Sequence, residues 1–297
     1  MGWFHTTFHN QIAEIWNFAR SLDKPVHPTI TWTSGIINAK GDFDDLQTHA
    51  LALASSIIIQ HDVVPKIIFG WDCPVTSSEL SKSENLRRQL FPHLLMRSLD
   101  CEPTYYIDHR HLLLLRSPYS IAWPYSLGMG YRAKYLGAQA SLTTHTIVSD
   151  IDTICVKPCI PYLESEIDID PNTFCITNWY DDVNLSVGLC VYNTAKFRNI
   201  FWPLLTRCHW SSHRRDGTFI QHVRRTFPEY KDILDIRLMN RNKISTERFW
   251  KSRVRKNYWT EKTMHYHAWK GEARKDKDGF HDYYQSVLDS LMQKIYA

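Results

Sequence analysis

Apolar residues recur along the first half of the chain with two spacings in alternation, one helical and one extended. The helical spacing predicts helices at 8–20, 46–61 and 78–98. Short β-branched and aromatic runs near proline or glycine predict strands at 29–34, 66–70 and 103–108. This alternation is typical of an α/β protein with a mainly parallel sheet and helices on its faces. Ligands of such sheets bind at the carboxyl ends of the strands, here near Ser34, Gly35 and Asp108.

The second half continues with both kinds of pattern. Helices are predicted at 131–140, 195–208 and 217–227, and strands at 146–149, 173–177, 187–192 and 262–267. The sequence contains no internal repeat, low-complexity tract or flexible linker. We therefore predict a single domain over 1–297, a Rossmann-like α/β/α fold with a mixed, mainly parallel central sheet.

The composition is that of a globular protein, since 43% of the 297 residues are apolar and the chain contains 11 Trp and 15 Tyr. The net charge of +4 is unevenly distributed. Residues 1–200 contain 15 Lys and Arg against 20 Asp and Glu, whereas residues 201–297 contain 20 against 11. A basic C-terminal third is either a solvated surface or the binding site of an anion, such as nucleic acid or a nucleotide diphosphate.

Several features bear on location. No apolar run approaches the roughly 18 residues of a membrane span, and the first residues do not resemble a signal peptide. They do match the loose myristoylation pattern, which would place a lipid on Gly2. The seven cysteines are scattered without a C-x-x-C pair, which favours free thiols in a reducing compartment. We therefore expect a cytoplasmic protein.

Two aspartates separated by one residue occur four times, at 42/44, 150/152, 168/170 and 276/278. Only Asp150 and Asp152 follow a β-branched run and precede another apolar run, which places them where a buried strand meets a cleft. Two carboxylates there repel each other and need a cation. Mg²⁺ or Mn²⁺ would use one or two carboxylates and complete its shell with phosphate oxygens and water. The alternative is a pair that caps a turn or binds an arginine.

Two stretches, 130–140 and 145–158, resemble the core of the GT-A glycosyltransferases, in which a helix bearing Arg or Lys precedes a strand that ends in a D-x-D motif. Residues 184–192 resemble the strand that lies against the donor sugar in that superfamily, and 264–271 resemble its C-terminal H-x-W-H-G or H-x-x-G segment. The match departs from the pattern at Lys270, which replaces the second histidine. It covers about half of the chain and is a superfamily-level match.

The resemblance implies a metal-dependent enzyme that transfers a sugar from a nucleotide-sugar, first of all a UDP-sugar, to a hydroxyl of a glycan. Asp150 and Asp152 would hold Mn²⁺ or Mg²⁺, with His267 or alternatively His265 completing the shell. About 1–157 would bind the donor and about 158–297 the acceptor. A bacterial or virus-encoded cytoplasmic setting fits better than the Golgi lumen. Donor-binding residues are expected at Thr33, Ser34, Gly35, Asp108, Arg132, Lys134, Asp150, Asn184, Gly188, Lys270 and Gly271.

Asp216 is the candidate catalytic residue. It precedes a glycine at the expected start of a helix, where it could simply be the N-cap. The resemblance implies instead that an acid near this point meets the acceptor hydroxyl, and it would be the general base if the reaction inverts. Asp181 and Asp182 are the alternatives for this role.

Two other functions remain open. A nucleic-acid-binding protein would use the basic, aromatic C-terminal third, with strong salt dependence and no need for a divalent ion. A metal-dependent phosphohydrolase or nucleotidyltransferase would use the same acidic pair but release phosphate or pyrophosphate.

Overall fold

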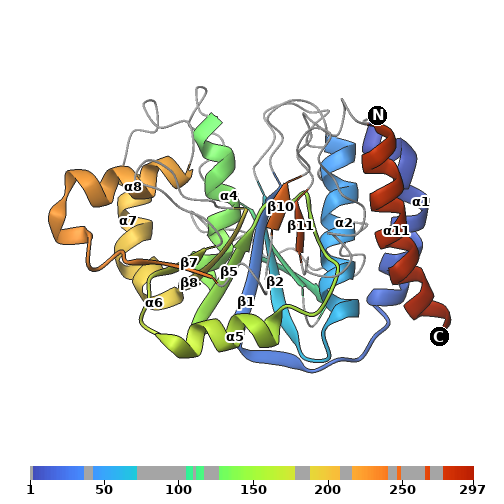
Figure 1. The fold of residues 1–297 in the computed structure, drawn as a ribbon, viewed down its shortest axis with the longest axis horizontal. Coiled ribbons are helices and arrows are strands. Elements are labelled where there is room, and N and C mark those ends of the chain that lie inside the picture. Colours follow the sequence, from blue (N-terminus) through green and yellow to red (C-terminus); the bar gives the residue numbers. More distant parts are fainter. Residues whose placement is uncertain are drawn as a thin grey trace.

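The computed structural model describes residues 3–36, 43–71, 105–109, 112–116, 127–177, 188–207, 216–239, 246–248, 265–267 and 277–297. Figure 1 shows these residues as a sheet with helices on both of its faces. The helix predicted at 78–98 lies outside the described residues. Five candidate site residues also lie outside them, namely Asp181, Asp182, Asn184, Lys270 and Gly271.

The main sheet has a parallel centre. Its described strands follow the order β3-β4-β2-β1-β5-β8-β7-β9. The parallel strands at the centre are β1 (Val26–Ile36), β2 (Val64–Trp71), β4 (Leu112–Arg116) and β5 (His145–Ser149). The carboxyl ends of these four strands therefore share one edge of the sheet.

Antiparallel pairs flank that centre. The remaining strands are β3 (Tyr105–His109), β7 (Cys175–Thr177), β8 (Leu189–Asn193) and β9 (Ile236–Leu238). β3 runs antiparallel to β4, and β8 runs antiparallel to β5 and β7, while β9 is parallel to β7. The prediction of an α/β fold with a mixed, mainly parallel sheet is confirmed.

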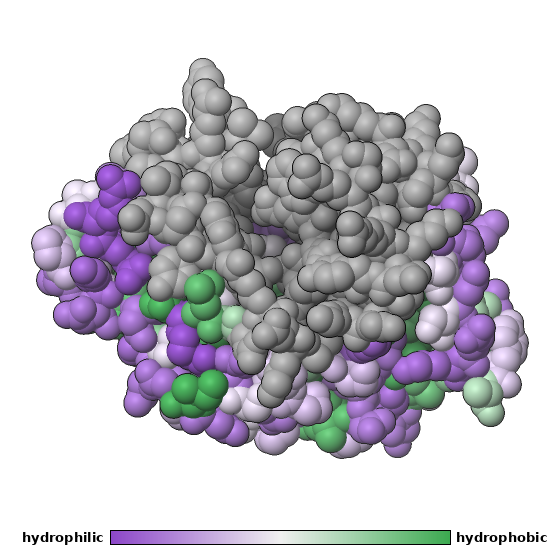
Figure 2. Space-filling view, in the orientation of Figure 1, coloured by the Kyte–Doolittle hydropathy of each residue, from purple (hydrophilic) through white to green (hydrophobic). Residues whose placement is uncertain are grey.

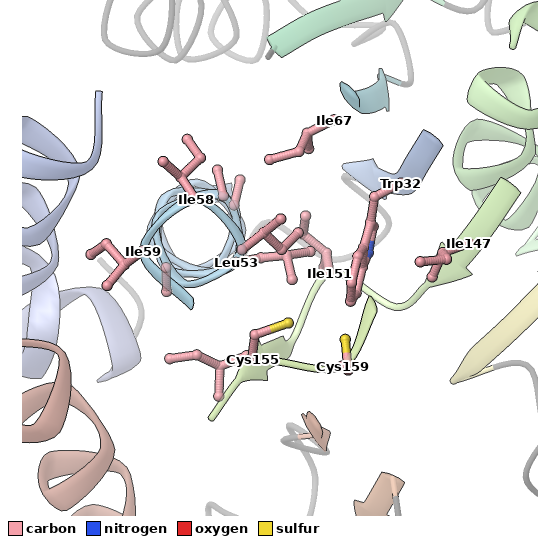
Figure 3. Packing of buried hydrophobic residues seen from close by; sticks show 14 of the residues in the cluster. Trp32, Leu53, Ile58, Ile59, Ile67, Ile147, Ile151, Cys155 and Cys159 are labelled. Atoms are coloured by element: carbon pink, nitrogen blue, oxygen red, sulfur yellow. The ribbon is translucent and has the colours of Figure 1, made fainter. Parts of the chain in front are cut away.

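Helices cover the two faces with different kinds of core. The helices α1 (Trp3–Ala19), α2 (Phe43–Gln60), α5 (Ile160–Ile169) and α11 (Lys277–Tyr296) contribute to one core cluster. That cluster is largely aliphatic, and Figure 3 shows Trp32 of β1 standing in it between Ile151 and Ile147. Because Trp32 is fully buried there, it fixes the position of β1 between α2 and β5.

The opposite core is aromatic. It lies against α4 (Leu127–Ala140), α6 (Thr194–Lys196), η1 (Phe197–Phe201), α7 (Trp202–Arg207) and α8 (Asp216–Thr226). Tyr135, Tyr192 and Phe201 are among its fully buried rings, and the Tyr135 and Tyr192 rings meet edge to face at 6.0 Å. Aromatic burial on this face holds α4 to the sheet, next to the predicted donor site.

Several elements differ from the expectations. β4, α5, β9 and α11 were not predicted, and the 3₁₀ turn η3 (Pro228–Tyr230) follows α8. β3 was expected to be parallel, but it is antiparallel to β4. The reason is that β4 begins three residues after β3 ends, and a parallel connection needs a crossover of a dozen or more residues.

The face of the molecule that Figure 2 shows is mainly polar where its residues are described. In the view of Figure 2 its hydrophobic residues form separate spots among hydrophilic ones. Leu142, Ile169 and Tyr296 are the most exposed of the large apolar side chains that the structure describes. In this described part of the chain, no helix has the length and apolar character needed to cross a membrane.

Candidate functional site

The predicted metal motif forms a turn at the carboxyl end of β5, which we call the acidic turn (residues 150–152). Ile151 points into the aliphatic core and is 8% exposed. The two flanking aspartates are partly exposed. Burial of the middle residue thus fixes a turn in which the carboxylates on either side can reach solvent.

Hydrogen bonds from neighbouring strands hold this turn. Trp32 donates its indole N–H to Ser149 Oγ at 2.9 Å, and Ser34 donates its hydroxyl to the Ser149 carbonyl at 2.8 Å. The Asp150 N–H donates to the Gly188 carbonyl at 3.2 Å, just before β8. The structure therefore brings together Asp150 and Gly188, two of the residues predicted to bind the donor.

Asp150 forms an ion pair with Lys134, another residue predicted to bind the donor. Lys134 Nζ lies 2.9 Å from Asp150 Oδ1. The lysine side chain is 3% exposed and the aspartate side chain 29%. The sequence predicted that a cation would neutralise Asp150. In the structure a buried lysine of α4 provides this positive charge at one of the two carboxylate oxygens.

Close packing of α4 on β1 sets the position of Lys134. A Cβ added at Gly35 would lie 2.5 Å from the Lys134 backbone nitrogen, and one added at Gly137 would lie 2.0 Å from Thr33 Oγ1. Thr33 also donates its hydroxyl to the Lys134 carbonyl at 2.9 Å. Glycine at 35 and 137 is therefore required for this approach.

The side-chain hydroxyls of Thr33 and Ser34 both form hydrogen bonds within the protein. Both are fully buried and hydrogen-bonded to α4 and β5 respectively. Their role in this structure is to hold Lys134 and Ser149 in place. Binding of the donor by the backbone near Gly35 stays a prediction.

A second, smaller sheet brings the C-terminal histidines to the acidic turn. Its strands are β6 (Thr153–Cys155), β10 (Thr246–Arg248) and β11 (His265–His267). β11 pairs antiparallel with β6, so His267 lies opposite Thr153, the residue after Asp152, and His265 lies opposite Cys155. The backbone register therefore places His267 closer to the acidic turn than His265.

The end of α2 holds the segment that follows the turn. Cys155 donates its N–H to Ser56 Oγ at 3.0 Å, and Cys159 donates its N–H to His61 Nε2 at 3.0 Å. The thiol of Cys155 hydrogen-bonds the Cys159 sulfur, which lowers the pKa of Cys159 to about 6 although burial opposes this. The described cysteines at 155, 159, 175 and 190 form no disulfide, as predicted.

The C-terminal helix α11 also reaches this region. It packs against α1 and α2 (Figure 1), and its Tyr284 is 1% exposed, with the Phe8 ring 5.0 Å away. Burial raises the pKa of Tyr284, and the charge of Asp152 raises it further. Tyr284 was missed in the sequence, although Tyr284, Leu288 and Leu291 have the helical spacing that predicts a buried helix face.

Three other predicted residues are described by their backbone. Arg132 lies in α4, two residues before Lys134, and Asp216 is the first residue of α8. Asp108 lies in β3, the edge strand, four positions from β5 in the sheet order. Since β3 is antiparallel, its carboxyl end points away from those of β1 and β5, so the topology separates Asp108 from the acidic turn.

Comparisons with known proteins return structures but no sequence relatives. No family model and no curated protein matches the chain. Mouse xyloside xylosyltransferase 1 is 11% identical over 82% of this chain and 97% of its own, with a TM-score of 0.44. A mannosyltransferase from Pyrobaculum calidifontis, solved with GDP-Man and Mn²⁺, is 11% identical over 77% of this chain and 76% of its own, with a TM-score of 0.39. The galactosyltransferase LgtC, solved with donor and acceptor sugar analogs, is 11% identical over 88% and 95%, with a TM-score of 0.45.

Proposed function

We propose that this chain is a metal-dependent glycosyltransferase of the GT-A kind, which transfers a sugar from a nucleotide-sugar to a hydroxyl of a glycan. One observation carries the proposal: segments that match the superfamily's motifs, far apart in the sequence, meet at the carboxyl end of β5. Lys134 is paired with Asp150, Gly188 accepts the Asp150 N–H, and His267 lies in register beside the residue after Asp152. Motif resemblance alone does not require that convergence.

The acidic turn fits a hard divalent ion in its donor chemistry. Asp150 and Asp152 offer carboxylate oxygens, and both side chains are partly exposed. Among the side chains that the structure describes, no third His, Cys, Asp or Glu joins them as a potential ligand. One or two carboxylates, with phosphate oxygens and water, make the usual site of Mg²⁺ or Mn²⁺. We propose His267 as a further ligand, ahead of His265, because of its register beside Thr153.

The charges at this site suit a leaving nucleotide diphosphate. Bound Mn²⁺ or Mg²⁺ would offset the negative charge that develops on the diphosphate as the sugar leaves. Lys134 places a further fixed positive charge at the same end of the sheet. Because it is buried, its ammonium interacts with nearby anions more strongly than it would in water. A UDP-sugar is the first donor to test.

Asp216 is proposed to accept the proton of the acceptor hydroxyl if the reaction inverts. Asp216 is the first residue of α8, one position after the N-cap, so it could act only by stabilising the start of the helix. Asp216→Asn separates the two roles, because losing the charge at a helix start costs at most about 1 kcal/mol, whereas Asn cannot take a proton. A base would lose about 10²–10⁴-fold in transfer rate. A variant that folds and transfers sugar at the wild-type rate would leave the role to Asp181 or Asp182.

The function is tested by a thermal-shift and binding screen. Wild-type protein is heated with UDP-, GDP-, CMP- and dTDP-sugars, each with Mn²⁺ and with EDTA, beside the Asp150→Ala, Asp152→Ala double variant. We expect one nucleotide class to raise the Tm of the wild type in the presence of Mn²⁺ only. The Asp235→Ala variant is the matched control, since Asp235 is paired with a lysine at the other end of the sheet.

Product analysis separates the remaining functions. With the donor that stabilises the protein, a glycosyltransferase releases nucleoside diphosphate, whereas a phosphohydrolase or nucleotidyltransferase releases phosphate or pyrophosphate. Affinity for single-stranded nucleic acid that falls steeply with salt and ignores EDTA would favour the binding protein instead. Full transfer activity in EDTA, or in the double variant, would refute the metal-dependent enzyme.

A further inference from the structure

We propose that the Lys134 ammonium is a built-in counter-cation of Asp150, which competes with the metal for this carboxylate and thereby makes metal binding depend on the nucleotide. By counter-cation we mean a positive side chain that neutralises Asp150 when no metal is bound. The inference rests on the function proposed above, because it concerns the same pair of aspartates. It adds that the metal binds well only together with the nucleotide, and it attributes this dependence to Lys134.

The backbone from which the ammonium extends is held in place. Gly35 lets β1 approach the Lys134 backbone so closely that a Cβ would lie 2.5 Å from its nitrogen. Thr33 donates its hydroxyl to the Lys134 carbonyl at 2.9 Å. With its main chain fixed on both sides, Lys134 can change partner by rotating its side chain but not by moving α4 away from β1.

The two cations would contact Asp150 from different directions. The Lys134 side chain is 3% exposed and touches Oδ1 from the interior, whereas the carboxylate is 29% exposed and can be reached from solvent. A divalent ion that binds Asp150 therefore meets a carboxylate whose charge is already offset. Two cations on one carboxylate repel each other, and this repulsion is strong where water is largely excluded.

A nucleotide diphosphate would remove that conflict. Its oxygens add ligands to the metal, and its negative charge gives the Lys134 ammonium a second partner close by. Metal alone should accordingly bind weakly, and metal with nucleotide should bind well. By linkage, the factor by which the nucleotide strengthens metal binding equals the factor by which the metal strengthens nucleotide binding.

The test measures Mn²⁺ affinity directly, by isothermal titration or by the EPR signal of free Mn²⁺, without nucleotide and with saturating UDP or GDP. Lys134→Met removes the charge and keeps the length of the side chain, and Lys134→Arg keeps the charge. Lys196→Met is the matched control, because Lys196 also lies 2.9 Å from an aspartate, at the far end of the sheet. Near-UV circular dichroism checks folding, and Lys134→Gln replaces the Met variant if that one does not fold.

We expect Lys134→Met to bind Mn²⁺ alone about tenfold more tightly than the wild type, within the usual range of coupling between ligands. The strengthening of Mn²⁺ binding by UDP or GDP should be about tenfold smaller in this variant. Lys134→Arg and Lys196→Met should both behave like the wild type. A merely structural lysine would not give this pattern, since its loss would weaken Mn²⁺ binding with and without nucleotide.

The failures are distinguishable. If the wild type binds Mn²⁺ with UDP or GDP, but Lys134→Met binds Mn²⁺ alone no more tightly, the competition is refuted and the proposed function stands. If the wild type binds no Mn²⁺ with either nucleotide, the metal-dependent function is refuted and the competition with it.

Discussion

Two lysine–aspartate ion pairs of equal length lie at opposite ends of the main sheet. At the carboxyl end of β5, Lys134 Nζ lies 2.9 Å from Asp150 Oδ1. At the far end, Lys196 lies 2.9 Å from Asp235 Oδ1, where β8 ends and β9 begins. The side chains are 3% and 29% exposed in the first pair but 27% and 36% exposed in the second. The same chemistry is thus set in two different surroundings.

The far-end pair has a local structural explanation. Asp235 also accepts the Phe174 N–H at 2.9 Å, so it joins β7 to the segment before β9 as well as to Lys196. An ion pair in contact with solvent contributes about 0–1 kcal/mol to stability, and the backbone hydrogen bond accounts for much of what Asp235 does.

The pair at the carboxyl end of β5 is not explained in this way. Removing a lysine from water costs free energy that the attraction to one carboxylate offsets only in part, and apolar residues in place of both partners are often as stabilising as the pair. Around this pair, two glycines and a buried threonine allow α4 to pack closely against β1. A costly charge in a rigid setting is typical of a functional site, and the contrast with the far-end pair yields four predictions.

The largest effect is expected from the carboxylates themselves. Asp152→Ala, and Asp150→Ala nearly as strongly, should lower the rate of nucleoside diphosphate release at least about 10²-fold, because each would remove one of the two proposed metal ligands. Asp235→Ala should keep the wild-type rate. The rates are measured with the donor found in the thermal-shift screen, at saturating Mn²⁺. Equal losses in Asp152→Ala and Asp235→Ala would show that carboxylates at both ends act only through the fold.

Next in size is the effect of Gly35→Ala on stability. The added Cβ meets a backbone nitrogen of α4, which cannot turn aside as a side chain could. Overpacking of this kind costs about 1–3 kcal/mol and occasionally more, so we expect a loss of at least about 2 kcal/mol in the free energy of unfolding. Urea denaturation measures it. A loss below about 0.5 kcal/mol, the size usual for surface substitutions, would mean that α4 can shift, and Lys134 would then not be rigidly held.

The sequence predicted the elements whose patterns are local. The strand before Asp150, the helix that carries Lys134 and the strand of His267 follow from spacing and motif order, and the structure contains all three. The partner of Asp150 could not be read in this way, because Lys134 is sixteen residues away in the sequence. The ion pair depends on which face of α4 meets β1, and Gly35 and Gly137 set that face through contacts between distant segments.

The errors in the fold have similar causes. The run Leu112–Arg116 lacks the polar alternation of a half-buried strand, and β3 was judged parallel because β4 was not recognised between it and β2. The helix α11 follows a charged stretch that hid its apolar face, although Tyr284, Val287 and Leu291 are buried in it. Where burial depends on a segment distant in the sequence, a local pattern fixes neither the type of secondary structure nor the direction of a strand in the sheet.

The third prediction compares the two lysines in their effect on stability. Lys134→Met leaves Asp150 without its ammonium, and breaking a fully buried pair costs about 3–5 kcal/mol. Because Asp150 is 29% exposed and can regain water, we expect a smaller loss of about 1–3 kcal/mol. Lys196→Met should cost about 0–1 kcal/mol. Both are measured by urea denaturation at low ionic strength, and equal losses would show that burial does not distinguish the two pairs.

The smallest effect concerns pH at the far end, where His145 begins β5. Its side chain is 7% exposed, and its Nε2 lies 3.1 Å from the Pro171 carbonyl. Burial lowers the pKa of His145, although this hydrogen bond and the charge of Asp168 oppose the shift. The unfolded chain therefore binds a proton on this residue more readily than the folded one. The contribution of His145 to stability is fully present above its unfolded pKa of about 6.5 and is lost as the pH falls toward the lower folded pKa.

The His145→Gln variant tests this, because its amide can still donate a hydrogen bond but does not titrate. It should lack the fall in the free energy of unfolding that His145 causes below pH 6.5. Subtracting the variant's free energy of unfolding from that of the wild type at each pH isolates it. A difference that stays constant below pH 6.5 would contradict the shift, whereas one that shrinks on acidification would identify His145 as an acid-sensitive residue at the far end of the sheet.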